Sequence, residues 1–250
     1  MLGLATIHSV SRATPRSVLL RLAMDPALEF SAGQAVLLGR AGSGVLRPYS
    51  IAVGPQEALK SHTLELLVGL GGDGTPGPHL PSLEPGTLVD VQGPFGTFVY
   101  PRHPGTATVL FVAGGSGIAP LRAMLHEAID TRTDATSAAG RGRTLCMLYS
   151  ARAPEEFAFD DELTALASRG ALVYRKTATR DASPQWQGDR GRINRAQLEA
   201  LVERPEDTLC FVCGPAALVH EVPRMLEEIG VPSDRIRVEE WAVTRGRGEG

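Results

Sequence analysis

The spacing of hydrophobic and polar positions changes near residue 102 of the chain. Before that point, apolar residues occur in short β-prone runs separated by turn residues, and no long helical pattern is present. The runs are SVLLRLAM (17–24), QAVLLGR (34–40), RPYSIAV (47–53), TLELLVGL (63–70), TLVDVQG (87–93) and GTFVYP (96–101). Their length and spacing predict an antiparallel β-barrel or sandwich over residues 1–102.

After a Pro/Gly-rich linker at 101–105, apolar strands alternate with amphipathic helices. The pairs are ATVLFVAGG (107–115) with APLRAMLHEAI (119–129), RTLCMLYSA (143–151) with FDDELTALASRG (159–170), and TLCFVCGP (208–215) with ALVHEVPRMLEEIG (217–230). Continuous apolar strands are typical of a parallel sheet covered on both faces. We therefore expect an α/β nucleotide-binding domain over residues 103–250, with a kink at Pro223, an exposed loop at 130–143 and a flexible C-terminal tail.

Composition narrows the classes of partner. The net charge of -3 and pI near 6.1 give no general attraction to nucleic acid or to an anionic membrane. The three cysteines are too few and too scattered for a disulfide framework or a four-thiolate metal or iron–sulfur site. No apolar stretch reaches the roughly 18 residues of a membrane helix, and no basic, then apolar leader is present. These features favour a cytoplasmic protein without a metal site, a membrane span or a nucleic-acid partner.

The run RPYS combines Arg47, Pro48, Tyr49 and Ser50 in one predicted strand. Alternation along a strand places Arg47 and Tyr49 on one face and Ser50 on the other or at a bend. An arginine can bind a diphosphate with two parallel hydrogen bonds, and a tyrosine can pack on a flat ring. For these four residues alone, an exposed arginine beside a half-buried tyrosine is the more ordinary interpretation.

A glycine-rich turn joins the first apolar strand of the second domain to its helix. It contains Gly114, Gly115, Ser116 and Gly117, and Pro120 falls in the first turn of the helix. Glycines let backbone approach a pyrophosphate, and free N–H groups at a helix start favour its charge. The spacing departs from the dinucleotide fingerprint G-x-G-x-x-G, so a plain strand-to-helix turn is the alternative.

Two further strand ends carry candidate residues. Cys213, Gly214 and Pro215 end one apolar strand, while Glu239 and Trp241 close the last one. Ligands of open α/β sheets bind at the carboxyl ends of strands, so the Cys-Gly-Pro turn and the glycine-rich turn are expected to face the same crevice and contact the nucleotide. Alone, Cys213 would more often be an inert core thiol.

The order of these motifs is more specific than any one of them. RPYS, then GPFG (93–96), GGSGIAP (114–120), YSAR (149–152), CGP (213–215) and a final Glu-x-aromatic resemble the ferredoxin–NADP reductase-like flavoprotein superfamily along nearly the whole chain. The resemblance implies an N-terminal FAD-binding barrel, a C-terminal NAD(P)-binding domain, and hydride transfer where the two cofactors meet. Related oxygenase reductases carry a fused iron–sulfur domain with a C-x4-C-x2-C run, which this sequence lacks.

The resemblance also assigns roles on the flavin side. Arg47 would bind the flavin diphosphate, Tyr49 would pack on the isoalloxazine ring and Ser50 would donate a hydrogen bond near flavin N5. The family then uses G-x-x-S or G-x-x-T, and Gly77 occupies the hydroxyl position here. Backbone amides from Gly74 to Gly77 can still form an anion-binding nest, with Thr75 as a hydroxyl donor. Because of this departure from the family motif, FMN remains an alternative to FAD as the flavin.

On the nicotinamide side, the resemblance places the turn 114–117 near the dinucleotide diphosphate and Cys213 near the nicotinamide. Ser50, Cys213 and Glu239 match residues around the hydride path. Trp241 matches the aromatic residue that covers the flavin in many members, although nine residues follow it here. The flavin supplies the redox chemistry, and these residues supply alignment and electrostatics.

Three arginines follow strand-like segments of the second domain: Arg152, Arg180 and Arg192. Guanidinium groups hold a 2′-phosphate well, so they predict a modest preference for NADPH over NADH. Asp181 and Asp189 nearby argue against it. The leading hypothesis is an NAD(P)H-dependent flavoprotein reductase that serves a separate ferredoxin or oxygenase component. The alternatives are a flavin-bearing subunit of a larger complex with little turnover of its own, and a reductase of free flavin.

Overall fold

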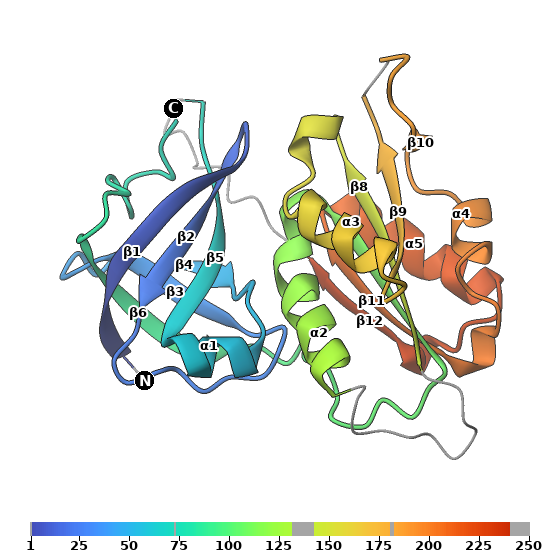
Figure 1. The fold of residues 1–250 in the computed structure, drawn as a ribbon, viewed down its shortest axis with the longest axis horizontal. Coiled ribbons are helices and arrows are strands. Elements are labelled where there is room, and N and C mark those ends of the chain that lie inside the picture. Colours follow the sequence, from blue (N-terminus) through green and yellow to red (C-terminus); the bar gives the residue numbers. More distant parts are fainter. Residues whose placement is uncertain (1, 73, 132–142, 181–182, 241–250) are drawn as a thin grey trace.

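The computed structural model describes residues 2–72, 74–131, 143–180 and 183–240. Two domains lie side by side, each built on one six-stranded sheet (Figure 1). Trp241, the predicted tail and nearly all of the predicted loop at 130–143 lie outside the described residues.

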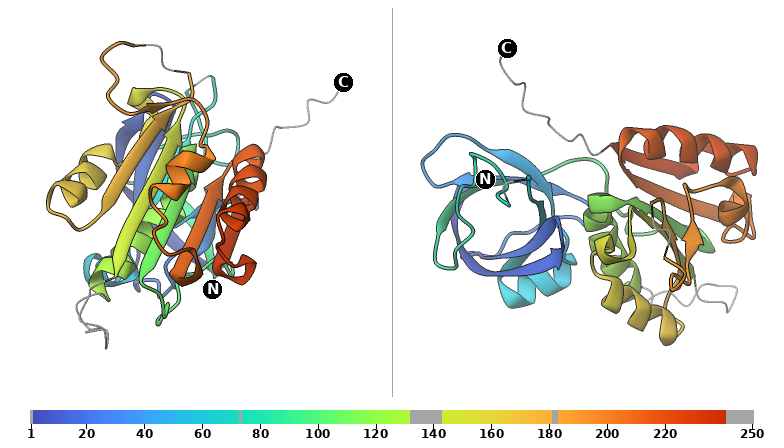
Figure 2. Two further views of the ribbon diagram at one scale, coloured as in Figure 1. Left: turned by 90° about the vertical axis from the view of Figure 1, so that its right-hand side faces the viewer. Right: turned by 90° about the horizontal axis from the view of Figure 1, so that it is seen from above.

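The first domain is an antiparallel barrel, as predicted. Its strands are β1 (Leu2–Thr14), β2 (Ser17–Ala23), β3 (Ala35–Arg40), β4 (Arg47–Ser50), β5 (Thr63–Gly69) and β6 (Leu88–Phe95). They pair in the order β4-β3-β6-β1-β2-β5. A bridge between Ile51 and Leu66 joins the two edges, so the strands form a ring when seen from above (Figure 2). Apolar side chains on the inner face, such as Ile7, Leu20 and Leu38, are fully buried.

One local expectation for the barrel is wrong. Residues 96–101 do not form a strand, because Phe98 and Tyr100 leave the barrel and pack in the core of the second domain. Among its described residues, the barrel domain has no long helix, as expected, but it includes a short one, α1 (Pro55–Ser61), and Pro55 suits its first turn. The predicted boundary at residue 102 lies between the last barrel strand and the next sheet, and its position stays a prediction.

The second domain is a parallel α/β sheet. Its strands are β7 (Thr108–Gly114), β8 (Thr144–Ala151), β9 (Val173–Ala178), β10 (Asp189–Arg190), β11 (Thr208–Gly214) and β12 (Ile236–Glu240), in the order β10-β9-β8-β7-β11-β12. Its helices are α2 (Ile118–Asp130), α3 (Asp160–Ser168), α4 (Arg195–Glu199) and α5 (Ala216–Glu228). Every residue of the central strands β7 and β11 is buried, which explains their continuous apolar sequences. Pro223 lies inside α5, which continues through it.

Helices cover both faces of this sheet. One core cluster joins alternate residues of β7, such as Phe111, to α2 and α3. The other joins Leu110 and Val112 to α4 and α5. Helix α2 lies between the sheet and the barrel (Figure 1). Among the described residues, no helix combines the length and the apolar character needed to cross a membrane.

The domain junction is part of the α2 core. Phe98 packs edge-on against Phe211 of β11, with ring centroids 5.8 Å apart. Arg237 of β12 donates a hydrogen bond of 3.0 Å to the carbonyl oxygen of Val99. The segment that follows the barrel is thus fixed to the second sheet through both β11 and β12.

Candidate functional site

The predicted flavin side is built on β4. Burial along this strand does not alternate, because Arg47 and Pro48 are exposed whereas Tyr49 and Ser50 are buried. A hydrogen bond of 2.7 Å joins the Tyr49 hydroxyl to Nε2 of His79, and the two rings stack with centroids 5.9 Å apart. Sequence reasoning missed His79, although it stands two residues after the predicted Gly77.

The surroundings of Tyr49 and His79 keep both side chains uncharged. Burial raises the pKa of Tyr49 to about 12. Burial, together with the nearby charge of Arg47, lowers the pKa of His79. Both rings are therefore uncharged near neutral pH, and Arg47 carries the fixed positive charge. Among the described residues, Arg47 forms no ion pair. An exposed guanidinium with open donors beside flat rings fits a ligand that combines a diphosphate with a planar ring system.

The glycine-rich stretch before His79 folds into tight turns. The N–H of Gly74 donates to the carbonyl oxygen of Gly71 at 3.0 Å, and the N–H of Gly71 donates to the carbonyl oxygen of Thr75 at 2.7 Å. Gly74 and Gly77 both have positive φ, +79° and +114°. The Gly74 amide is thus engaged inside the loop and Pro76 has no N–H, so two of the four residues of the predicted nest offer no donor to a ligand.

The glycine-rich turn of the second domain approaches β11 closely. A Cβ atom at Gly117 would lie 2.3 Å from the carbonyl oxygen of Cys213, and one at Gly114 would lie 2.8 Å from Cδ of Pro215. These two glycines are therefore required for packing against the neighbouring strand end. Gly115 differs, because it is exposed and has φ +55°. Its carbonyl oxygen accepts a hydrogen bond of 3.0 Å from the buried Tyr149 hydroxyl.

A pocket of about 450 Å³ opens at the carboxyl ends of β7, β8, β9 and β11. Seven predicted site residues line it: Gly114, Gly115, Ser116, Arg152, Arg180, Arg192 and Pro215. Three predicted residues of the same turns do not line it; Gly117, Pro120 and Gly214 are buried. The structure thus brings both predicted turns and all three predicted arginines to one crevice.

Arginine dominates this pocket. The N–H of Arg180 donates to the carbonyl oxygen of Arg152 at 2.8 Å. The two residues therefore lie side by side just beyond the ends of the neighbouring strands β8 and β9. Both are exposed, and among the described residues neither forms an ion pair. Arg192 lies 3.5 Å from Glu221. A fourth arginine, Arg16 of the barrel, also lines the pocket, and sequence reasoning missed it. Arg16 is paired with Glu156, and both Glu156 and Glu221 line the pocket too. The unpaired guanidinium groups of Arg152 and Arg180 fit an anionic nucleotide.

The three predicted hydride-path residues are only partly brought together. Cys213 and Glu239 stand opposite each other in the register of β11 and β12. Among the described residues, no hydrogen bond joins Ser50 to either of them. Ala52, two residues after Ser50, shares one core cluster with Cys213. Cys213 is fully buried, and burial together with the charge of Glu239 raises its pKa, so the thiol stays protonated. Burial also raises the pKa of Glu239, to about 7.

Comparisons with known proteins agree with this architecture. An oxidoreductase FAD-binding domain model matches residues 2–100, and an oxidoreductase NAD-binding domain model matches residues 111–223. Ferredoxin–NADP reductase B of Sorangium cellulosum (strain So ce56) is 35% identical over 225 residues, which span 85% of each chain. This chain belongs to the ferredoxin–NADP reductase-like flavoprotein family. It is an oxidoreductase with an FAD-binding and an NAD-binding domain.

Solved structures of reductases share the two-domain fold. A Neisseria gonorrhoeae ferredoxin–NADP⁺ reductase with bound FAD and NADP has a TM-score of 0.75 and 25% identity, over 96% of this chain and 98% of that one. The Amycolatopsis cytochrome P450 reductase GcoB has a TM-score of 0.79 and 24% identity, over 96% of this chain and 70% of that one. The prediction of an N-terminal antiparallel barrel followed by an α/β domain with a parallel sheet is confirmed.

Proposed function

We propose that this reductase family member oxidises NAD(P)H, with NADPH slightly preferred, and passes the electrons through FAD to a separate ferredoxin or oxygenase component. The observation that carries the proposal is the pocket at the strand ends, lined by four arginines and placed beside the junction with the FAD-binding barrel. The pocket is large enough for a nucleotide, its arginines complement the negative charge of a nucleotide, and it lies next to the proposed flavin-binding domain.

On the flavin side, we propose that Arg47 binds the diphosphate of one noncovalent FAD. The buried Tyr49, held through its hydroxyl by His79, provides a rigid platform against the ring system. The N–H of Gly77 and the hydroxyl of Thr75 complete the proposed diphosphate site. When bound, FAD accepts two electrons as a hydride and releases electrons singly. The protein's own contribution is binding and orientation.

On the nicotinamide side, we propose that Ser50, Cys213 and Glu239 position the ring and that none acts as a covalent nucleophile. A nucleophilic cysteine needs an accessible thiolate. Cys213 is fully buried and its pKa is raised, so its thiol is neither accessible nor ionised. Hydride transfer between two cofactors depends on alignment more than on acid–base chemistry.

The preference for NADPH is proposed from Arg152, Arg180 and Arg192. Two of them have no carboxylate partner in the described part of the chain, so a 2′-phosphate gains charge-assisted hydrogen bonds worth roughly 1.5–3 kcal/mol each. Arg180→Ala should therefore lower kcat/KM for NADPH by about tenfold or more and leave NADH nearly unchanged. Arg195→Ala, an exposed arginine on α4 paired with Glu199, is the matched control. The preference for NADPH would be refuted if the wild type favours NADH, or if Arg180→Ala leaves the ratio of kcat/KM for NADPH to that for NADH unchanged. Neither result would affect the reductase proposal.

The acceptor is proposed to be a separate protein, either a ferredoxin or an oxygenase component. The Sorangium relative is a ferredoxin–NADP reductase, which favours a ferredoxin as acceptor. Purified protein separates the three hypotheses. The leading hypothesis, a reductase with a separate acceptor, is supported if the protein retains flavin, NADPH reduces that flavin, and a ferredoxin reoxidises it. Retained flavin that NADPH leaves oxidised supports a subunit of a larger complex. Protein that retains no flavin but reduces added flavin supports a free-flavin reductase.

A further inference from the structure

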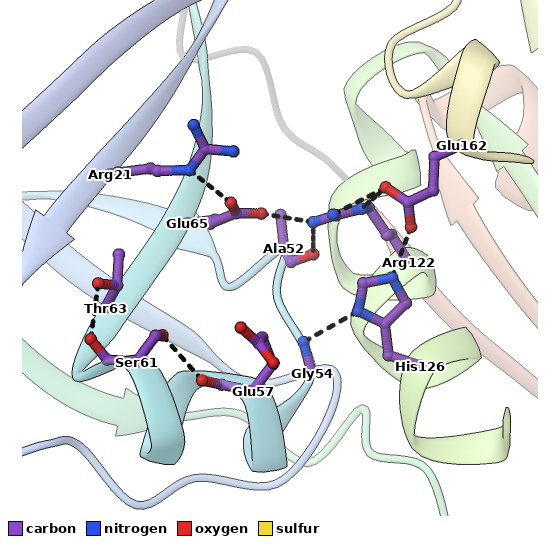
Figure 3. Close-up of polar contacts among 10 residues, drawn as sticks. All are labelled: Arg21, Ala52, Gly54, Glu57, Ser61, Thr63, Glu65, Arg122, His126 and Glu162. Atoms are coloured by element: carbon purple, nitrogen blue, oxygen red, sulfur yellow. Dashed lines mark hydrogen bonds and ion pairs between the residues drawn. The ribbon is translucent and has the colours of Figure 1, made fainter. Parts of the chain in front are cut away.

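One buried polar cluster joins the two domains, and its centre is Arg122 in the second turn of α2 (Figure 3). Only 9% of this arginine is exposed. A guanidinium this buried loses its hydration, and that loss must be offset by acceptors on all sides. The partners of Arg122 therefore indicate what it does.

The guanidinium of Arg122 contacts both domains. Nη1 donates to the carbonyl oxygen of Ala52 at 2.6 Å and to Oε2 of Glu65 on β5 at 2.7 Å. Nε and Nη2 both reach Oε2 of Glu162 on α3 at 2.8 Å. The guanidinium also lies over the ring of Phe159, 4.4 Å from its centroid. A single side chain thus ties the barrel to two helices of the α/β domain.

His126, one turn further along α2, adds a second tie. Its Nδ1 accepts a hydrogen bond of 3.3 Å from the N–H of Gly54, and its Nε2 lies 2.6 Å from Oε1 of Glu162. A Cβ atom at Gly54 would lie 2.7 Å from Cβ of His126, so the helix and the barrel segment are in direct contact there. Residues 52–54 are therefore held to α2 at both ends (Figure 3).

These ties connect the two cofactor sides by a short path. Ala52 follows Ser50 of the predicted flavin clamp by two residues, and α2 begins directly after the glycine-rich turn that lines the arginine pocket. We propose that Arg122 is a positioning residue, which fixes the flavin-clamp strand relative to the nucleotide turn and so sets the approach of the nicotinamide to the flavin. This inference rests on the proposed function. Hydride transfer is sensitive to such placement, since a displacement of about 1 Å can cost on the order of 100-fold in rate.

A purely stabilising role is the competing explanation, and the cluster offers a matched control. Arg21 donates to Oε1 of Glu65 at 2.7 Å, so it shares a carboxylate with Arg122. It lies on β2, however, and touches only the barrel part of the cluster (Figure 3). Arg21→Met removes an arginine from the same network without releasing the domain junction.

The kinetic test uses FAD-loaded protein and anaerobic stopped flow. We expect Arg122→Met to bind FAD and NADPH with unchanged Kd, since neither proposed site contains Arg122. At saturating NADPH its rate constant for flavin reduction should fall by on the order of tenfold or more. Arg122→Lys keeps the charge but reaches fewer partners, so it should restore the rate only in part. Arg21→Met should behave as wild type. An Arg122→Met protein that retains FAD and is reduced at the wild-type rate overturns the proposal.

A second readout does not depend on the flavin. In flavin-free protein, amide hydrogen exchange at residues 52–54 and at the start of α2 should accelerate in Arg122→Met and not in Arg21→Met. Faster exchange spread evenly through both domains would show a stabilising role alone and would also overturn the proposal. If Arg122→Met does not fold, Arg122→Lys decides by the same two measurements. A wild type that NADPH fails to reduce refutes the proposed function instead, and the exchange comparison still decides whether Arg122 fixes the junction.

Discussion

Glu239→Gln should remove a pH dependence of stability that a half-buried carboxyl group imposes on the wild type. Burial raises the pKa of Glu239 from its ordinary value of 4.5 to about 7. Between these values the folded protein keeps a proton that the unfolded chain has released, so stability falls as the pH rises through this window. The destabilisation is absent below the lower value and complete above the higher one.

The size of the pKa shift of Glu239 sets the expected change in the free energy of unfolding. A pKa difference of this size corresponds to about 3 kcal/mol, at about 1.4 kcal/mol per pH unit. Glu239 is partly exposed, so screening by solvent reduces the expected effect to about 1–2 kcal/mol. For a chain of this size, that is a shift of roughly 2–8 °C in Tm.

The assay is thermal unfolding of flavin-free protein at about pH 4 and about pH 8. Glu239→Gln should match the wild type at the lower pH and exceed it at the higher pH by the stated amount. Glu240→Gln, at the exposed neighbouring position on the same strand, is the control and should follow the wild type at both. A wild type and a Glu239→Gln variant with the same pH dependence would refute the reasoning that burial governs this carboxyl group.

Three further variants test individual residues. Arg47→Ala should weaken FAD binding by about tenfold to 150-fold, because it removes one charge-assisted hydrogen bond. The variant should therefore purify mostly without flavin. Full flavin occupancy would refute the assignment of Arg47 to the diphosphate. Cys213→Ala should slow flavin reduction while flavin stays bound, and unchanged reduction kinetics would exclude Cys213 from the site. Gly117→Ala should destabilise the protein by about 1–3 kcal/mol or more, because its Cβ would lie 2.3 Å from a backbone carbonyl oxygen. Gly3→Ala, where nothing lies within 4 Å, should change stability little, and equal effects of the two would contradict the packing argument.

The second domain could be predicted from the sequence in detail because its signals are local. Strands β7 and β11 are buried along their whole length, so apolar residues must be continuous in the sequence. Carboxyl ends of parallel strands lie on one side of a sheet, so residues that follow different strands meet there. For that reason Arg152 and Arg180 were expected to lie together, and the structure places them side by side.

Features that depend on distant partners could not be predicted. The short β-prone run at 96–101 is what a barrel strand would show, and only the second domain's core explains why Phe98 and Tyr100 leave the barrel. Helix α1 has seven residues, too few for a helical period to emerge. Arg16 lines the arginine-rich pocket, and it is 140 positions away in the sequence from its partner Glu156. No local pattern marks such a contact.

The most direct test of the central claim is single-turnover reduction of the FAD-loaded protein under anaerobic conditions, with NADPH carrying either hydrogen or deuterium at the transferred position of the nicotinamide. If hydride passes between the two proposed sites, the visible absorbance of the flavin should be lost completely within one fast phase. Deuterium at that position should slow this phase, because the bond to the transferred atom breaks in it. Flavin that stays bound and oxidised with both NADPH and NADH would contradict the claim that this chain is an NAD(P)H-dependent flavoprotein reductase.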